Sequence, residues 1–426
     1  MPILLIVLAT WCGVLPSIPV FAEEGRRVEY AIERRLIRQP LDHANPKGPG
    51  LEERLTIARP PGTTAESPVF FMITGEITVR DGYIRLLSDF YHDAARPMIF
   101  MTLEHRGFGE STSRDQDQTV PSYVTREQAV EDAHAAVQAL RPEFPGPWIG
   151  VGWSYGGSLV IEHGSRYPRD FNALLSVSGI TEWSYFQSTF DESARKLLGG
   201  GLYRRLARKI ADLTPRETFD ETWKQREFAS GLTKGLLFRK DINALKLFFK
   251  FASLFKTKRF LKVLHWLDQT FAKGEGWRYA LSTSAPKVSR AEVATGDYDY
   301  RVFRYMQCTE LGYFDLPSGQ PSIYTRTPQD FRDECHALFG AYPEPQAEWH
   351  PGRLIGSLRP PLFYAKGGRD PFGGQQLPDD YVMPHGKFYY WPKGLHDPDD
   401  DPALASRILK DIWRILDLPG PISSRG

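Results

Sequence analysis

A serine set between glycines is the residue of this chain whose type and surroundings most directly suggest chemistry. It stands in Gly152-Trp-Ser154-Tyr-Gly156, a G-x-S-x-G pattern with an apolar run before it and a helix-like stretch after it. A serine hydroxyl is a nucleophile when it sits on a sharp strand-to-helix turn and a base takes its proton. The glycines leave room for such a turn. We predict Ser154 as a nucleophile; the alternative is a glycine-rich turn that binds nothing.

The base and the acid that this serine needs are expected later in the chain, in the order serine, acid, histidine. Asp370 follows an apolar run and a pair of glycines, and His396 follows the last apolar run. His385 stands at the start of that run and is the rival base, while the acidic cluster around Asp399 has the character of a solvated loop. We predict Asp370 as the acid that orients His396, and His396 as the base.

Two backbone N–H groups are needed to bind the negative oxygen of a tetrahedral intermediate. One conventionally comes from the residue after the nucleophile, here Tyr155, and the other from the loop after an early strand. That loop contains Gly75 and Glu76, so these two residues are the candidates for the second donor. Such chemistry needs no metal and no organic cofactor, and we predict neither.

Apolar runs that alternate with helical patterns indicate the fold class. The runs lie at 69–74, 98–104, 148–152, 173–178, 362–365 and 388–391, and helical patterns lie at 125–140 and 156–167. Thr125 and Gln128 are predicted to form a capping box at the start of the first helix. The alternation predicts an α/β protein with a doubly wound, mostly parallel sheet and helices on both of its faces.

The alternation stops between residues 183 and 300, where the sequence is helical and basic. Residues 195–273 hold 19 Lys and Arg against 7 Asp and Glu, although the 426-residue chain has a net charge of only +1. We predict a helical cap inserted at 183–300 between two parts of one catalytic body, 23–182 and 301–426. The cap is expected to be a lid over the cleft, with contact to an anionic membrane surface as the less favoured alternative.

The first 22 residues have the features of a signal peptide. Residues 2–22 carry no charge, and an apolar run at 3–15 is followed by two prolines and the small residues Val20 and Ala22. We expect cleavage after Ala22 and export to the periplasm or the outside; a retained membrane anchor is the alternative. Export leaves Cys308 and Cys335 in an oxidising compartment, where we expect them to form a disulfide. Two free thiols in a cytosolic enzyme are the other interpretation.

Five segments, taken together, resemble the prolyl carboxypeptidase and dipeptidyl peptidase II family of serine peptidases. They occur in the family's order: Gln39-Pro-Leu-Asp-His-Ala-Asn45, Leu103-Glu-His-Arg-Gly-Phe-Gly-Glu-Ser111, Ser154-Tyr-Gly-Gly-Ser158, Gln307-Cys-Thr-Glu-Leu-Gly-Tyr313 and Gly368-Arg-Asp-Pro371. The resemblance implies an α/β-hydrolase fold with a helical cap and assigns the catalytic triad to Ser154, Asp370 and His396. It also implies an exopeptidase that acts near proline, either as a carboxypeptidase or as an aminopeptidase.

Three further residues are candidates for substrate binding. Glu310 can bind the terminal amine of a peptide, or it can satisfy buried polar groups beside the cysteines. Tyr313 and Trp153, with Tyr155, can form an apolar wall for a proline ring, or they can belong to the core. The chain departs from the family pattern at Thr74-Gly75-Glu76 and at Phe372, and these positions affect the second oxyanion donor and the proline pocket.

Composition and the absence of further motifs exclude several classes of function. Charged residues make up 25% of the chain and hydrophobic residues 41%, as in ordinary globular proteins. The sequence has no nucleic-acid-binding module. A peptide is the expected partner, and a homodimer is left open. An exported esterase with the same triad and a catalytically silent envelope binding protein are the alternatives to an exopeptidase.

Overall fold

The computed structural model describes residues 30–76, 79, 84, 91, 93, 96–112, 121–183, 190–211, 250, 298–312, 322–323, 327–340, 349–370, 372–397 and 401–416. The predicted signal peptide, Tyr313 and most of the predicted cap lie outside these residues. Within the described part, no helix combines the length and the apolar character that crossing a membrane requires.

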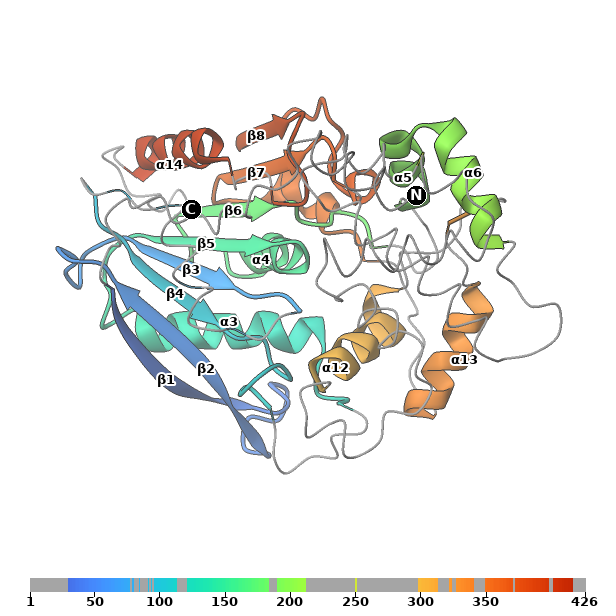
Figure 1. Cartoon of the computed structure of the whole chain (residues 1–426). Coiled ribbons are helices and arrows are strands. Elements are labelled where there is room, and N and C mark those ends of the chain that lie inside the picture. Colours follow the sequence, from blue (N-terminus) through green and yellow to red (C-terminus); the bar gives the residue numbers. More distant parts are fainter. Residues whose placement is uncertain are drawn as a thin grey trace, which may run out of the picture.

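One sheet forms the centre of the described structure (Figure 1). Its eight strands lie in the order β1-β2-β4-β3-β5-β6-β7-β8. In chain order they are β1 (Ala31–Pro40), β2 (Gly50–Arg59), β3 (Val69–Ile73), β4 (Ile99–Leu103), β5 (Trp148–Trp153), β6 (Ala173–Val177), β7 (Leu362–Gly367) and β8 (Gly386–Trp391). From β4 to β8 all neighbouring strands are parallel, whereas β1, β2 and β4 pair antiparallel. The predicted α/β class and mostly parallel sheet are confirmed.

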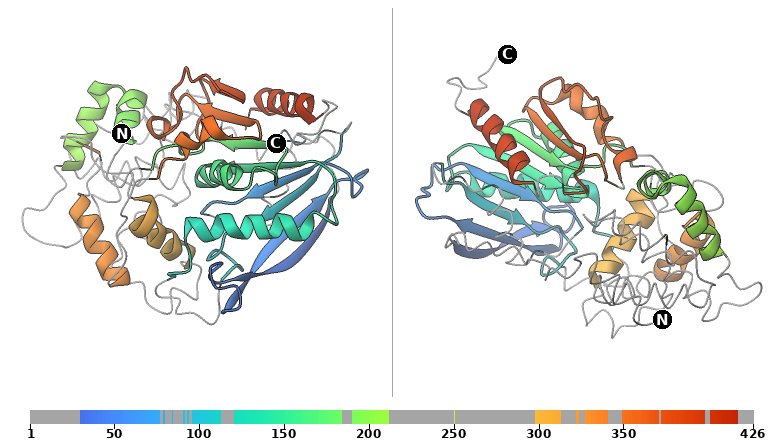
Figure 2. Two further views of the ribbon diagram at one scale, coloured as in Figure 1. Left: turned by 180° about the vertical axis from the view of Figure 1, so that it is seen from behind. Right: turned by 45° about the horizontal axis from the view of Figure 1, so that its top comes forward.

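Helices cover both faces of this sheet (Figures 1 and 2). Helices α3 (Arg126–Leu140) and α4 (Tyr155–Arg166) lie on one face and α14 (Pro402–Leu416) on the other. Side chains of successive strand residues point to opposite faces, so Phe71 packs in the core beneath α3 and α4, and Phe70 packs in the core beneath α14. This two-sided burial explains why the central strands are continuous apolar runs.

The capping box predicted at the start of α3 forms only in part. Thr125 Oγ1 accepts a hydrogen bond from the backbone N–H of Gln128, at 3.3 Å. The Gln128 side chain does not return to Thr125; it donates to Asp42 Oδ1 and accepts from the backbone N–H of His43. The second half of the capping box is therefore replaced by contacts that attach the β1–β2 connection to α3.

A group of helices lies beyond the carboxyl ends of the parallel strands (Figure 1). It contains α5 (Phe190–Leu198), α6 (Gly200–Ala211), α12 (Tyr298–Met306) and α13 (Pro328–Phe339). The short helices are the π-helix η1 (Gln307–Leu311) and the 3₁₀ helices η2 (Pro351–Ser357) and η3 (Gly373–Gln375). Helix α12 runs across residue 300, the boundary expected from the sequence, and α13 follows it. Among the described residues, the next strand of the sheet after β6 is β7.

A buried ion pair attaches the β1–β2 hairpin to the body of the protein. Arg106 Nε donates to Asp132 Oδ2 at 2.5 Å, and another guanidinium nitrogen donates to Asp132 Oδ1 at 2.6 Å. The same guanidinium donates to the carbonyl oxygens of Pro40, Leu41 and Tyr123. Two of the segments that resemble the peptidase family, 39–45 and 103–111, meet in this network, so Arg106 holds the β1–β2 hairpin against α3.

Replacing Arg106 with Met should lower the free energy of unfolding by about 3–5 kcal/mol, because the buried charge of Asp132 would lose both guanidinium hydrogen bonds and keep its contact with the His43 ring. Urea unfolding followed by tryptophan fluorescence measures the change. Arg35→Met is the matched control: its ion pair with Glu143 is half-exposed, and such surface pairs contribute about 1 kcal/mol or less. Equal losses in the two variants would contradict the structural importance of the buried pair.

Candidate active site

Ser154 occupies the strained turn that a nucleophile elbow requires. It lies between the end of β5 and the start of α4, with φ of 52° and ψ of −120°. This left-handed region is unfavourable for residues with a side chain. The turn is held by the Ser154 N–H, which donates to the carbonyl oxygen of Val177 at 3.0 Å. A Cβ atom on Gly152 would lie 2.2 Å from the carbonyl oxygen of Gly156, so glycine is required there.

Asp370 and His396 come together as the sequence predicts. Asp370 follows β7, His396 follows β8, and His396 Nδ1 lies 2.8 Å from Asp370 Oδ2. The backbone N–H of Phe372 donates to Asp370 Oδ1 at 2.9 Å, and the Phe372 ring lies 4.9 Å from the His396 ring. With Nδ1 bound to the acid, Nε2 is left as the nitrogen that can exchange a proton with a serine.

The order of the strands brings all three residues to one edge of the sheet. Strands β5, β6, β7 and β8 are parallel neighbours, so their carboxyl ends meet at the same edge. Ser154, Asp370 and His396 each follow one of these strands directly or by a short loop. The structure therefore joins a strained serine, a buried carboxylate and a histidine in the arrangement of an acyl-transfer site.

Charge at this site stabilises the protonated form of the histidine. Burial disfavours the imidazolium of His396, but the charge of Asp370 and the hydrogen bond to it outweigh burial and raise the pKa of His396 to about 9. Burial would raise the pKa of Asp370, yet His396, the Phe372 N–H and the Gln376 side chain together hold that pKa below its usual value. The carboxylate is thus ionised and the histidine is a strong base.

The rate of Ser154 acylation should rise with pH, because His396 accepts the serine proton only when it is neutral. We expect kcat/KM for an ester substrate without titratable groups to fall about tenfold per pH unit below the pKa of His396, with a midpoint on the alkaline side of pH 7 and approaching 9. Steady-state kinetics from pH 5 to 10 measure this profile. A plateau that extends down to pH 6 would contradict the raised pKa.

The loop after β3 lies against the elbow, where a second oxyanion donor is needed. A Cβ atom on Gly75 would lie 3.0 Å from the backbone nitrogen of Gly156, so this backbone approaches the first turn of α4 closely. Burial raises the pKa of the Glu76 carboxyl, and its own backbone N–H and His396 oppose that rise. Both candidates for the second donor, Gly75 and Glu76, thus lie beside the site, with Tyr155 as the first residue of α4.

Glu310 has a structural contact that its sequence position alone did not reveal. It lies in the π-helix η1, and its Oε2 accepts a hydrogen bond from the backbone N–H of Arg126 at 2.7 Å. Arg126 is the first residue of α3, so the carboxyl sits at the positive end of that helix. Burial raises the pKa of Glu310 to about 7, although the N–H and the charge of Arg126 oppose the rise.

The aromatic residues proposed as a proline wall have different environments. Tyr155 is fully buried, with Trp183 and Trp349 rings 5.9 Å away. Its side chain therefore belongs to the core, which is one of the two environments that the sequence left open. Trp153 is half-buried and packs near Tyr91, at 6.2 Å, on the face of the sheet that carries α14. Tyr313 lies outside the described residues.

One side chain beside the acid was missed in the sequence analysis. Gln376 donates to Asp370 Oδ2 at 2.5 Å. It stands six residues after the acid, in a loop with no motif of its own, and a single glutamine in such a loop leaves no sequence signal. Only the structure brings it to the carboxylate.

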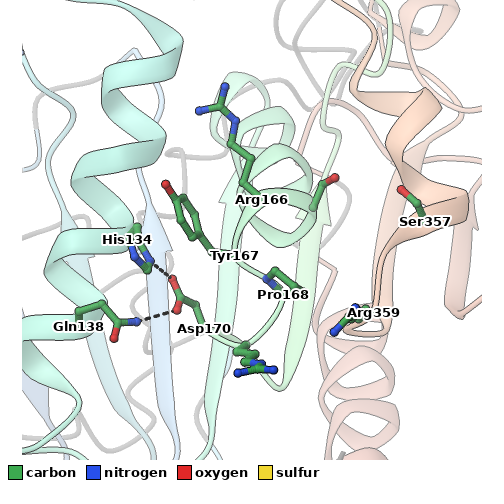
Figure 3. A pocket seen from close by; sticks show the side chains of 10 residues that line it. His134, Gln138, Arg166, Tyr167, Pro168, Asp170, Ser357 and Arg359 are labelled. Atoms are coloured by element: carbon green, nitrogen blue, oxygen red, sulfur yellow. Dashed lines mark hydrogen bonds and ion pairs between the residues drawn. The ribbon is translucent and has the colours of Figure 1, made fainter. Parts of the chain in front are cut away.

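A pocket at the far end of α4 is separate from this site (Figure 3). Its lining comes from α3, the end of α4, the loop before β6 and the end of η2: His134, Gln138, Ser165, Arg166, Tyr167, Pro168, Arg169, Asp170, Ser357 and Arg359. Asp170 accepts hydrogen bonds there from His134 and Gln138. Ser154 precedes the first residue of α4, and the helix has 12 residues, which is about 18 Å of helix. Among the described residues, no cluster of His, Cys, Asp and Glu could hold a metal ion.

Comparison with known proteins connects this geometry with a family. The sequence model described as Serine carboxypeptidase S28 matches residues 61–195, which contain the β3 loop, the elbow and Ser154. Over these residues the chain is similar to S28 serine carboxypeptidases. Asp370 and His396 lie beyond the S28 match, and their pairing comes from the structure.

Three relatives of the chain are named as peptidases or proteases. The prolyl tri/tetrapeptidyl aminopeptidase of Streptomyces mobaraensis is 26% identical over 198 residues, 44% of this chain and 39% of the relative. The Arabidopsis thaliana protein EDA2, named as a serine protease, is 23% identical over 350 residues, 72% of this chain and 68% of the relative. The Caenorhabditis elegans protein K12H4.7, also named as a serine protease, is 35% identical over 83 residues, 18% of this chain and 16% of the relative. The chain thus spans less than half the length of two of these relatives.

The chain also aligns with solved structures at low identity. Proline iminopeptidase of Mycobacterium smegmatis is 14% identical, with a TM-score of 0.40, over 89% of this chain and 100% of that chain.

Proposed function

We propose that the chain is a serine exopeptidase that hydrolyses short peptides at proline-containing termini through an acyl-enzyme. The observation that carries this proposal is the hydrogen bond between His396 and Asp370 at the sheet edge where Ser154 occupies a left-handed turn. The S28 match supports the peptidase class. The proline preference rests on the resemblance of five sequence segments and on the name of the Streptomyces relative.

In the proposed reaction, Ser154 Oγ attacks the carbonyl carbon of the substrate while His396 takes the serine proton. The backbone N–H of Tyr155 and one from Gly75 or Glu76 bind the resulting oxyanion. The C–N bond then breaks, and His396 gives its proton to the departing amine. Water, deprotonated by His396, attacks the acyl-enzyme and releases the carboxylic acid, which restores Ser154.

Peptides of the form Xaa-Pro-Xaa, blocked at one end and then at the other, test the proposal. Mass spectrometry of the products shows from which end residues are released. We expect cleavage beside proline. This cleavage should stop when the end from which residues are released is blocked and should continue when the other end is blocked. Turnover of p-nitrophenyl esters without any peptide cleavage would replace the peptidase with an esterase. No labelling by a fluorophosphonate would favour a silent binding protein.

Glu310 is proposed to bind the free amine of the substrate. Its carboxyl uses Oε2 for the Arg126 N–H, and a substrate ammonium would supply the cation that favours its ionised form. Glu310→Gln keeps an acceptor for that N–H but removes the charge. We expect KM for peptides with a free amine to rise about 10-fold to 100-fold, as for a lost charged hydrogen bond, with N-blocked ester substrates unchanged.

Glu127→Gln is the matched control for this experiment. Glu127 is an exposed acid in the same first turn of α3. It should leave KM unchanged for both kinds of substrate. If Glu310→Gln changed KM equally for substrates with a free amine and with a blocked amine, Glu310 would not bind the amine, and its role would be to stabilise the start of α3.

We also propose that the protein is exported, cut after Ala22 and oxidised at Cys308 and Cys335. The uncharged apolar run at 3–15 supports export, and the Cα atoms of Cys308 and Cys335 lie 5.9 Å apart, within the range that a disulfide requires. Mass spectrometry of protein secreted by its host, without reductant, should give a chain that starts at Glu23 and gains the mass of two hydrogen atoms when a thiol reductant is added. An intact N-terminus on secreted protein would contradict the cleavage site.

A further inference from the structure

We infer that Gln376 is a positioning residue of the triad, which fixes the carboxylate of Asp370 relative to both His396 and the turn that holds Ser154. This inference rests on the proposed function. Gln376 would be a fourth side chain of the site, and its role would be to hold the acid. Its amide group would be necessary for this role, and another buried side chain would not replace it.

The contacts of Gln376 fix the orientation of its amide. Its Nε2 donates to Asp370 Oδ2 at 2.5 Å and to the carbonyl oxygen of Ser178 at 3.2 Å. Both partners are acceptors, so the group between them has to be a donor with two N–H bonds, and a carboxylate cannot replace it. Gln376 is buried, at 6% exposed, so water cannot replace these hydrogen bonds if they are lost and the unpaired groups would destabilise the folded state.

Gln376 acts on the same oxygen that holds the histidine. Asp370 Oδ2 accepts from His396 Nδ1 and from Gln376 Nε2, while Oδ1 accepts from the Phe372 N–H. The Asp370 side chain is fully buried, and a buried carboxylate stays ionised only if donors compensate for the lost water. Two donors from one loop, 372–376, therefore keep the acid charged and leave one direction open for His396.

The second bond of Gln376 connects the acid to the nucleophile. Ser178 follows β6 with φ of 49°, the other left-handed residue with a side chain among those described. Its neighbour Val177 accepts the N–H of Ser154. A continuous path thus runs from Asp370 through Gln376 to Ser178, and along the backbone to the residue that holds the elbow. The loop of Gln376 is itself attached to this segment, since the N–H and hydroxyl of Thr181 donate to the carbonyl oxygen of Gln375.

Fluorophosphonate labelling of Ser154 measures the triad without knowledge of the peptide substrate. In this reaction Ser154 Oγ forms a bond to phosphorus, fluoride leaves, and His396 takes the serine proton. The second-order rate constant is measured from pH 5 to 10 for the wild-type chain, Gln376→Met, Gln376→Glu and Thr181→Val, with the thermal midpoint of each. The other titratable groups that face Asp370 and His396 are Tyr364, Glu76 and Asp397, and they are the same in all four proteins.

Each variant has its own expected profile. Gln376→Met removes the donor and should slow labelling at least tenfold at every pH. Gln376→Glu places two carboxyl groups within 3 Å, which cannot both ionise easily and share one proton. The Gln376→Glu variant should be labelled while the shared proton remains and should lose labelling at alkaline pH. Its plot of labelling rate against pH therefore gains a descending limb that the wild type lacks. Thr181→Val removes one bond of the same loop without touching Asp370 and should keep the wild-type profile.

The outcomes separate the inference from the proposed function. If Gln376→Glu and Gln376→Met keep the wild-type rate and profile, the inference is overturned. A lower thermal midpoint with no change in the pH profile of Gln376→Glu would reduce Gln376 to a packing role and overturns it as well. Should Gln376→Met not fold, the alkaline limb of Gln376→Glu decides. A wild-type chain that labels but cleaves no peptide overturns the proposed peptidase and leaves this test of Gln376 intact.

Discussion

Replacing Ser154 with Ala should abolish fluorophosphonate labelling and lower kcat for peptide hydrolysis by about 10⁶-fold. The reason is that the acyl-enzyme can no longer form, while binding and the oxyanion donors remain. Alanine places the same Cβ in the left-handed turn as serine does, so the backbone strain at φ of 52° is unchanged and the fold should survive. Single-turnover kinetics with a proline-containing peptide measure the residual rate.

Ser165→Ala is the control for this substitution. Ser165 lies on the same helix, α4, near its end, and lines the separate pocket. It should label and turn over as the wild type does. If Ser154→Ala kept more than a thousandth of the wild-type kcat, or if it were still labelled, another residue would be the nucleophile and the site would have to be sought elsewhere.

Asp370→Asn should lower kcat by about 10⁴-fold, through the tautomer of His396. Asparagine keeps the shape of the acid and can still accept from the Phe372 N–H at the Oδ1 position, but its NH₂ group then takes the Oδ2 position and faces His396 Nδ1 and Gln376 Nε2. The imidazole must put its proton on Nε2 and cannot accept the serine proton. Burial lowers the pKa of His396, and without the charge of the acid it becomes the dominant influence on that pKa. The pH midpoint of the residual activity should therefore move to lower pH.

Asp379→Asn is the matched control for the acid. Asp379 stands in the loop between β7 and β8 and pairs with Lys366 at 2.8 Å, but its side chain is 58% exposed. It should change kcat less than about twofold, as expected for the loss of an exposed ion pair. A pH midpoint in Asp370→Asn equal to that of the wild type would show that Asp370 does not set the basicity of His396.

The parts of the fold that could be predicted are those whose burial makes a simple pattern. Strands β3 to β8 include the six apolar runs found in the sequence, because both faces of the parallel sheet are covered. Strands β1 and β2 were missed, since charged residues such as Arg34 and Glu52 stand on their exposed faces and break up any apolar run. Periodicity alone also did not reveal that α12 and α13 continue the helical region past residue 300.

The residues of the site also include some whose positions the sequence predicts and some whose positions it does not. Ser154, Asp370 and His396 could be predicted because each follows an apolar run that forms a strand and the chemistry demands their order. Gln376 and the contact of Glu310 with α3 could not, since both depend on where a loop or a π-helix turns in space. The sequence left two environments open for Tyr155, a proline wall or the core, and the structure places its buried ring in the core.

The pairing of β6 with β7 has a consequence for the protein during its synthesis. These neighbours in the sheet are residues Ala173–Val177 and Leu362–Gly367. All residues between the two strands are therefore synthesised after β6 and before β7. Such a distant contact forms late, because the chain must close a long loop first. A nascent chain that already carries Ser154 on its elbow therefore has neither acid nor base, and it remains inert as a hydrolase until its last strands have joined the sheet.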